Sequence, residues 1–163
     1  VIAAGLGSRA LAASAGIDLP IRPQKGQGIV TDRVPGRQQV FVSKARQTHD
    51  GHFILGSSVE EDAPDLSTDF ETFGKSIARS LQILPALKHA KLLRVWAAYR
   101  IMTPDSYPIY VESDVFPGVH VAVCHSGITL GAFHAIGVPA QLTGEAADNP
   151  MTPFSLNRFK EAE

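Results

Sequence analysis

The stretch Phe70-Glu-Thr-Phe73-Gly-Lys-Ser-Ile77-Ala-Arg-Ser-Leu81-Gln-Ile-Leu84 decides the fold prediction for this chain. Its apolar residues recur at spacings of three and four, which places them on one face of a helix that ends near Pro85. A helix with one apolar face must cover another element in order to bury that face. The neighbouring segments indicate which element this is.

The residues before this helix are typical of an antiparallel sheet. Strand-like runs at 28–32, 39–43 and 52–56 are separated by the turn signals Pro35-Gly36 and Asp50-Gly51. Beyond the helix, residues 92–102 and 107–112 also predict strands, joined by a turn, and we expect these two strands to pair. The helix at 70–84 is therefore expected to cover an antiparallel sheet.

The two ends of the chain follow a different pattern. Residues 1–4 predict a short strand that turns at Gly5 into an Ala-rich helix, and residues 119–142 repeat this order of strand, turn and helix. We expect the ends, residues 1–18 and 118–163, to pack as one α/β lobe and residues 19–117 to form an antiparallel lobe. The fold class is therefore α+β, with ligands expected in a cleft between lobes.

Composition and charge exclude several classes of function. Fifteen Lys plus Arg against 16 Asp plus Glu leave a net charge of −1 without a basic stripe, so no nucleic-acid partner is expected. The single cysteine, Cys124, allows no internal disulfide, which fits a cytoplasmic location. No run approaches the roughly 20 apolar residues of a membrane span. The chain begins without Met, inside a strand, so we interpret it as a piece of a longer protein.

A glycine-rich turn raises an alternative function. Gly5-Leu-Gly-Ser-Arg-Ala10 matches a relaxed dinucleotide fingerprint, in which glycines lie between a strand and a helix. That fold needs a parallel strand about 20 residues further on, whereas Leu19-Pro-Ile-Arg-Pro23 cannot form an interior strand. An NAD(P)-binding oxidoreductase is one alternative, and a substrate-binding or assembly module without catalysis is another.

Several motifs, in order along the chain, resemble one family. Val1-Ile-Ala-Ala-Gly5 with Ser8, Leu19-Pro-Ile-Arg-Pro-Gln-Lys-Gly-Gln27, Asp50-Gly-His-Phe-Ile-Leu-Gly56 and the tail Pro153-Phe-Ser-Leu-Asn-Arg-Phe159 are similar to FAD-dependent oxidoreductases of the D-amino-acid oxidase, glycine oxidase and sarcosine oxidase superfamily. The residues from Trp96 to Leu130 look most similar to the branch of opine oxidase and hydrogen cyanide synthase. The resemblance covers essentially the whole chain, and the chain resembles the C-terminal half of these enzymes.

The most specific motif is Trp96-Ala-Ala-Tyr-Arg-Ile-Met-Thr-Pro-Asp105, which resembles the family's Trp-Ala-Gly-x-Arg-Pro-x-Thr-Pro-Asp stretch. The resemblance implies that Arg100 is the catalytic and substrate-binding residue that holds the substrate carboxylate, because a guanidinium grips a carboxylate through two parallel bonds. The alternative is an arginine in a surface ion pair. Tyr99 and Tyr107 are expected to line the substrate pocket.

The segment Cys124-His-Ser-Gly-Ile-Thr-Leu130 resembles the family's final flavin-contacting loop. A turn at a helix start aims free N–H groups at one point, which suits the flavin edge where negative charge accumulates on reduction. The expected cofactor contacts are Gly5, His125, Ser126, Gly127, Ile128, Thr129 and Leu130. No metal is expected, since His49 and His52 lack a third ligand.

The resemblance implies a flavoenzyme that oxidises the C–N bond of an amino acid or an opine-like secondary amine to an imine, with FAD as the cofactor. The glycine-rich βαβ unit that holds the rest of FAD lies in the N-terminal half of the family, and nothing in this chain replaces it. We therefore expect the chain alone to be inactive and to need that half. Partner subunits of a hetero-oligomeric dehydrogenase are also implied, through which a cytoplasmic protein could associate with a membrane.

Overall fold

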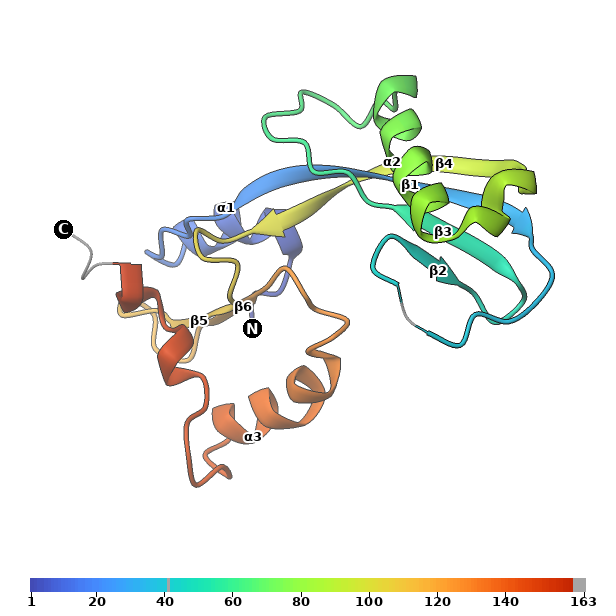
Figure 1. Cartoon of the computed structure of the whole chain (residues 1–163). Helices are drawn as coiled ribbons and strands as arrows, with labels where there is room; N and C mark the ends of the chain where they lie inside the picture. Colours follow the sequence, from blue (N-terminus) through green and yellow to red (C-terminus); the bar gives the residue numbers. More distant parts are fainter. Residues whose placement is uncertain (41, 160–163) are drawn as a thin grey trace. The chain divides into compact units, whose positions relative to one another are not determined.

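The computed structural model describes residues 1–40 and 42–159 of the chain, which form two compact units (Figure 1). One unit comprises Val1–Pro23 together with the chain from Ile101 onward, and the other comprises Gln24–Arg100. These units are defined by compactness alone, which assigns no cofactor or substrate role. The domain boundaries expected after residues 18 and 117 therefore remain predictions.

The unit of residues 24–100 is built on a sheet of four strands, β1 (Arg22–Arg33), β2 (Ala45–Gln47), β3 (His52–Gly56) and β4 (Leu92–Met102). Their order is β2-β3-β1-β4. β3 pairs antiparallel with both β1 and β2, so that Leu55 lies opposite Ile29 and Ala45. Figure 1 draws β4 running opposite to β1. The predicted α+β class with an antiparallel sheet is confirmed.

A helix, α2 (Phe70–Ile83), covers one face of this sheet and confirms the predicted apolar stripe (Figure 1). Asp69 caps the helix by accepting a hydrogen bond from the Thr72 N–H at 2.7 Å. The core formed with the sheet contains Ile29, Ala45, Phe53, Leu55, Phe73 and Leu87, with Ile77, Leu81 and Leu84 packed against it. Phe70 was expected on the same face but is 94% exposed, because the buried stripe begins one turn later at Phe73.

The predicted strand at 39–43 is wrong where the structure describes it, and Phe41 lies outside the described residues. Val42 makes a single bridge to Ala45, and the strand next to β3 is β2. The physical reason lies in two glutamines. Gln38 and Gln47 exchange hydrogen bonds between side-chain oxygens and backbone N–H groups, at 2.7 and 3.2 Å. These bonds join residues 38 and 47, so the described residues between Gln38 and β2 form a loop.

The other unit contains η1 (Gly5–Gly7), α1 (Ser8–Ala13), β5 (Ile109–Glu112) and β6 (His120–Val123). β5 pairs with β6, so the expected pairing of residues 107–112 with the strand at 92–102 is wrong; β4 instead lies beside β1. Ile2 bridges in parallel to Val121, which brings the start of the chain beside β6. The core of this unit contains Ala12, Ile17, Leu19, Ile21, Ile109, Val121 and Val123.

Beyond β6 the chain turns at residues 127–130 and is helical from residue 131 to 142, in agreement with the predicted order of strand, turn and helix. This helix contains a π segment, η3 (Phe133–Gly137), followed by α3 (Val138–Leu142), and two further turns are η2 (Pro85–His89) and η4 (Thr152–Phe154). η5 (Leu156–Phe159) ends the described chain. Among the described residues, no helix has the length and apolar character that crossing a bilayer requires.

Candidate functional site

Arg100, near the end of β4, is held by oxygen atoms of its own unit. Its Nη1 donates to the Lys25 carbonyl at 3.3 Å and to Gln24 Oε1 at 3.5 Å. Its Nη2 donates to the Ser58 carbonyl at 2.9 Å and to the Ser57 hydroxyl. All four acceptors are neutral, and Arg100 forms no ion pair with any residue of ranges 1–40 and 42–159. The charge of this guanidinium is therefore not compensated by a described carboxylate.

Two glycines of β1 make room for the side chains that β4 carries. A Cβ at Gly26 would lie 2.3 Å from Arg100 Nη2, and a Cβ at Gly28 would lie 2.4 Å from the Trp96 ring. Both distances are below any real contact, so the guanidinium and the indole lie directly on the backbone of β1. Glycine inside a strand often marks such a close approach. The alternation Gly26-Gln27-Gly28 is the sequence signal that could have placed Arg100 over β1.

A buried polar network fixes the segment that accepts from Arg100. Lys25, 5% exposed, contacts Glu60 Oε2 at 3.1 Å, and Gln27 Nε2 donates to the same carboxylate and to Asp69. Burial raises the pKa of Glu60, but hydrogen bonds from Ser58, Lys25 and Gln27 outweigh it and lower that pKa. Residues 57–60 are thereby tied to β1, which positions the oxygens around Arg100. No motif in the sequence pointed to Gln24, Ser57 or Ser58 as contacts of Arg100.

The two tyrosines expected in the pocket have different surroundings. Tyr99 adjoins Arg100 on β4, so the strand pleat directs it to the opposite face of the sheet, where its hydroxyl donates to the Ala63 carbonyl at 3.2 Å. Tyr107 belongs to the other unit, is 61% exposed and contacts the Phe154 ring at 6.1 Å between centroids. The structure does not bring Tyr99 and Arg100 together, and the roles of both tyrosines remain predictions.

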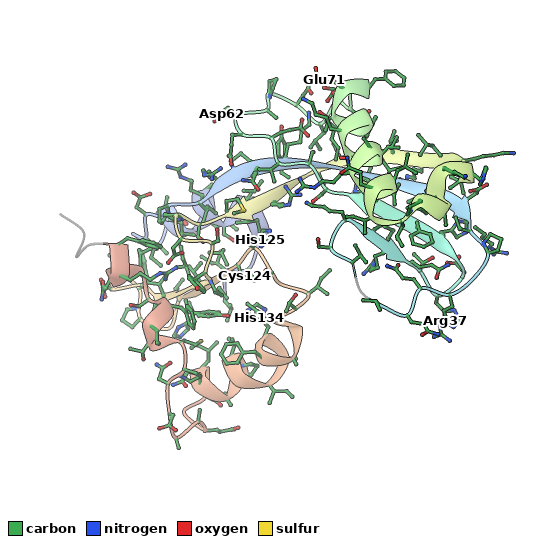
Figure 2. All side chains as sticks on the ribbon, viewed as in Figure 1. Arg37, Asp62, Glu71, Cys124, His125 and His134 are labelled. Carbon is green, nitrogen blue, oxygen red and sulfur yellow. The ribbon has the colours of Figure 1, made fainter. Side chains whose placement is uncertain are left out.

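The turn expected to contact flavin follows β6 and is open to solvent. Residues 125–129 are exposed, and Ile128 is fully exposed. His125 Nδ1 lies 3.0 Å from the Ser126 hydroxyl, and the Leu130 N–H donates to the Ser126 carbonyl within the turn that precedes the helix. Figure 2 shows Cys124 and His125 at the end of β6 and His134 on the helix beyond. Among the described residues of its own unit, no segment covers the side chains of this turn.

A cavity of about 320 Å³ lies beside this turn, and Gly5, Ile101, Cys124 and His134 are among its lining residues. Gly5 has φ +62°, the left-handed region, and a Cβ there would lie 3.6 Å from Ile101 Cδ1. Burial raises the pKa of the Cys124 thiol. The pKa of Tyr110 is raised to about 12, mainly by burial and secondly by a negative charge on Cys124. The Tyr110 hydroxyl therefore keeps its proton and can donate it to His134 Nε2 at 2.8 Å. The thiol and the phenol therefore stay neutral near pH 7.

Two motifs that the sequence analysis quoted separately meet in the same unit. Arg158 of the tail contacts Asp105 through Nε at 2.7 Å and Nη2 at 3.1 Å. Its guanidinium also donates to the carbonyls of Pro108 and Ser155, at 2.9 Å each. The pKa of the Asp105 carboxyl is lowered, and the hydrogen bond from Arg158 is the largest cause. This pair joins the chain end to the segment before β5.

The glycine-rich turn at residues 5–10 leads into α1, as a dinucleotide fingerprint would, but the next strand does not complete such a unit. β1 pairs antiparallel with β3 and not with the residues beside Ile2. Among the described residues, no group of three or more His, Cys, Asp or Glu side chains is arranged to hold a metal ion.

Comparisons with known proteins agree with these motifs. The chain is 34% identical over 159 residues to an opine oxidase subunit of Agrobacterium tumefaciens and 29% identical over 153 residues to HcnC, a hydrogen cyanide synthase subunit of Pseudomonas protegens. These matches cover 98% and 90% of the chain but only 43% and 37% of the relatives. The chain therefore spans less than half the length of these relatives.

Solved structures share the fold. L-proline dehydrogenase from P. horikoshii matches with a TM-score of 0.85 and 24% identity, over 100% of this chain and 48% of the other. Glycine oxidase from Geobacillus kaustophilus matches with a TM-score of 0.79 and 21% identity, over 94% of this chain and 44% of the other. The family model described as "DAO: FAD dependent oxidoreductase" matches residues 1–137. The chain belongs to this family of FAD-dependent oxidoreductases.

Proposed function

We propose that the protein carrying this chain oxidises the C–N bond of an amine whose α-carbon bears a carboxylate, and that Arg100 binds this carboxylate. One observation carries the proposal: the Arg100 guanidinium lies against four neutral oxygens and pairs with no carboxylate of the described residues. A fixed cation without a counter-charge is complementary to an anionic ligand. The alternative of a surface ion pair has no support from these contacts.

The contacts of Arg100 also suggest how a ligand would be accommodated. Each Nη donates to one backbone carbonyl, of Lys25 or Ser58, and to one side chain. The Gln24 contact is the longest of the four at 3.5 Å, and the Ser57 side chain is exposed to solvent, where a ligand could reach it. A carboxylate would replace these two side-chain oxygens, one on each nitrogen. The two carbonyls would keep the guanidinium in place.

The proposed reaction is a two-electron oxidation of the amine followed by hydrolysis of the imine. The α-carbon of the substrate loses a hydride and the amine nitrogen loses a proton, which leaves an imine with a C=N bond. Bound FAD supplies the chemistry that accepts the hydride with its two electrons. Water then adds to the imine carbon, and cleavage of the C–N bond gives a carbonyl compound and an amine. In this scheme Arg100 orients the α-hydrogen and needs no proton transfer of its own.

We propose that the exposed turn contacts one edge of FAD, and we assign no residue here to its adenine end. Ser126, Gly127, Ile128, Thr129 and Leu130 would contact the flavin, with His125 beside them. Gly5 adds no side chain to the adjoining cavity, and a Cβ there would occupy part of it in a strained conformation. The exposure of the turn and the position of Gly5 in the cavity wall support this proposed role in cofactor binding.

The partner subunits, the N-terminal FAD-binding unit and the location of the whole protein are also proposals. Two relatives are named as subunits, one of opine oxidase and the other, HcnC, of hydrogen cyanide synthase. We propose that this protein likewise works with partner subunits and that an N-terminal βαβ unit holds the adenine and pyrophosphate of FAD. A cytoplasmic location, with membrane association through partners, belongs to the same proposal.

A flavin titration tests the cofactor assignment. The purified chain is titrated with FAD by absorbance and thermal shift, alone and mixed with the N-terminal half of the related opine oxidase subunit. We expect saturable binding only in the mixture, and Gly127→Val in the exposed turn to weaken it. Equal FAD binding without the added half would contradict the expectation that this half is needed. No binding in either case would favour a binding module.

The substrate assignment is tested with Arg100→Gln in the reconstituted enzyme. We expect KM for a carboxylate-bearing amine to rise by roughly 10- to 100-fold, because a charge-assisted pair is lost. Arg37→Gln, on an exposed loop labelled in Figure 2, is the matched control and should leave KM unchanged. An Arg100→Gln enzyme with unaltered KM for the carboxylate substrate would refute the role of Arg100.

A further inference from the structure

A cavity of about 480 Å³ lies between the end of β3 and α2, within the unit of residues 24–100. Its walls come from the loop before β2, from residues 56–60 and from α2. Three cations line it, namely Lys44, Lys75 and Arg79, and Glu60 is the one acidic group among its described lining residues. This cationic cavity is separate from the Arg100 guanidinium, which does not line it.

A hydrogen-bonded junction holds the walls of this cavity together. The Lys44 carbonyl accepts from the Gly56 N–H at 3.2 Å and from the Ser80 hydroxyl at 3.1 Å. The loop, β3 and α2 therefore meet at one oxygen, and Ser80 is fully buried there. Because these contacts form without a ligand, the Lys44 side chain and the polar face of α2 are already placed around one space.

Two of the three cations have no carboxylate partner among the described residues. Lys75 pairs with Glu71, which Figure 2 labels, at 2.6 Å. Lys44 Nζ donates only to the Ser57 carbonyl, at 3.4 Å, which leaves its charge uncompensated. The Arg79 side chain forms no hydrogen bond or ion pair within residues 1–40 and 42–159. Lys44 and Arg79 thus bring two positive charges to the cavity without a described counter-charge.

Glu60 does not neutralise these two charges, because its carboxylate has other partners. It contacts the buried Lys25 at 3.1 Å and accepts from Gln27 Nε2 at 3.0 Å. The arrangement also places Lys75 and Arg79 four residues apart on α2, and like charges at this spacing destabilise a helix. An anion in the cavity would offset this repulsion.

The charge and the polar lining of the cavity favour a phosphate over a carboxylate. A phosphate monoester carries about two negative charges near pH 7 and three strong acceptor oxygens, which matches the two uncompensated cations. A carboxylate carries one charge and two oxygens. Ser76 lines the same cavity one turn before Arg79, and its hydroxyl has no hydrogen-bond partner among the described residues. It is therefore available as a further donor to a phosphate oxygen.

We infer that this cavity binds a phosphate group, either as free phosphate or as part of a small phosphorylated compound. Arg79 and Lys44 supply the positive charges, and Ser76 supplies a neutral donor. A guanidinium and an ammonium are both well suited to phosphate oxygens. The volume exceeds that of a phosphate alone and lies in the range of small-molecule sites, so it leaves room for a carrier group. The inference does not depend on the role proposed for Arg100.

Isothermal titration calorimetry of the unmodified chain tests this site with inorganic phosphate, glycerol phosphate and acetate. The ionic strength is kept constant, because salt screens exposed charges. The variants at the site are Arg79→Gln, Lys44→Gln and Ser76→Ala. Arg37→Gln is the matched control, since it removes an exposed arginine that does not line the cavity. Arg100→Gln detects phosphate that binds at the proposed substrate site instead.

We expect saturable phosphate binding that becomes about tenfold weaker in Arg79→Gln and in Lys44→Gln, because each loses a charge-assisted contact. Ser76→Ala should weaken binding about threefold, since it loses a neutral donor. Arg37→Gln and Arg100→Gln should bind phosphate as the unmodified chain does. Both phosphate sources support the site: tighter binding of glycerol phosphate identifies an ester as the ligand, and equal or weaker binding identifies free phosphate.

Four results would overturn the inference. The first is the absence of saturable phosphate binding to the unmodified chain, whose fold a melting curve verifies. The second is an equal loss in Arg79→Gln and Arg37→Gln, which would show a general effect of charge. The third is acetate binding as tight as that of phosphate and weakened by the same variants. The fourth is loss of phosphate binding in Arg100→Gln with binding intact in Arg79→Gln, which would assign the anion to the Arg100 site.

Discussion

Arg100 and Arg158 both belong to motifs of this family, yet their surroundings differ in charge. Arg158 contacts the Asp105 carboxylate through two nitrogens and donates to three carbonyls. Arg100 contacts two carbonyls, a hydroxyl and an amide oxygen. Both guanidinium groups are well supplied with acceptors, but only Arg158 has a negative partner among the described residues.

This difference separates a structural arginine from one suited to a ligand. An ion pair satisfies charge and hydrogen bonds together, so a further anion would have to displace a carboxylate. Neutral oxygens satisfy the hydrogen bonds but leave the charge, so an anion can replace the two side-chain oxygens and gain Coulomb energy. The comparison predicts that exchanging these surroundings exchanges the properties of the two arginines.

The largest effect is expected when Arg100 receives a carboxylate of its own. Ser57→Asp places an acidic group where a hydroxyl now accepts from Arg100, and we expect anionic ligands to bind roughly 10- to 100-fold more weakly. Ser57→Asn introduces a neutral side chain of the same size as aspartate. It is the control and should change affinity much less. Titration with a monocarboxylate, read by Trp96 fluorescence, measures both. Equal losses in the two variants would mean that shape, not charge, is responsible.

The reverse change removes the carboxylate from Arg158. Asp105→Asn should lower the free energy of unfolding by about 2 kcal/mol, because a bidentate charge-assisted pair is lost at a partly buried position. Arg158→Gln should cost a similar amount, and the double variant should cost little more than either single one. Urea unfolding measures these values. Fully additive costs would show that the two residues do not stabilise the fold as a pair.

A smaller effect on anion affinity is expected when Gly26, which lies directly beneath the Arg100 guanidinium, gains a side chain. Gly26→Ala would set a Cβ 2.3 Å from Arg100 Nη2, so the flexible guanidinium must shift. We expect anion affinity to fall about tenfold while the free energy of unfolding changes by less than about 1 kcal/mol. Gly74→Ala, where the new Cβ meets nothing within 4 Å, is the control. Unchanged affinity in Gly26→Ala would argue against a fixed guanidinium position.

The smallest expected effect is on the pH dependence of stability. It comes from Asp69, a carboxylate held by hydrogen bonds, whereas Asp105 is held by an ion pair. The Thr72 N–H, and next the Gln27 side chain, lower the pKa of Asp69 from 3.8 to about 2. Its contribution to stability is therefore present above pH 3.8 and is lost as the pH falls towards 2. Asp69→Asn keeps the helix cap but does not titrate. Between pH 4 and 2 we expect its stability to fall less steeply than that of the unmodified chain; parallel curves would refute this.

Local patterns predicted most of the elements and fewer of the pairings. The stripe at 70–84 and the run at 92–102 became α2 and β4, because periodicity reflects which face of an element is buried. The strand expected at 39–43 is wrong because the bonds between Gln38 and Gln47 close a loop over these residues, which residue preferences do not reveal. The partner of residues 107–112 was wrong because pairing depends on the whole sheet.

The sequence by itself determined the family motifs, the element types and the identity of Arg100 as a candidate. Only the tertiary structure decided what surrounds each arginine. Arg100 takes oxygens from Ser57 and Ser58, 43 and 42 residues away, and Arg158 takes its carboxylate from Asp105, 53 residues away. Contacts at such separations depend on how strands and loops fold back, which local periodicity does not encode. The charge around a guanidinium is therefore a property of the fold, while the guanidinium itself is a property of the sequence.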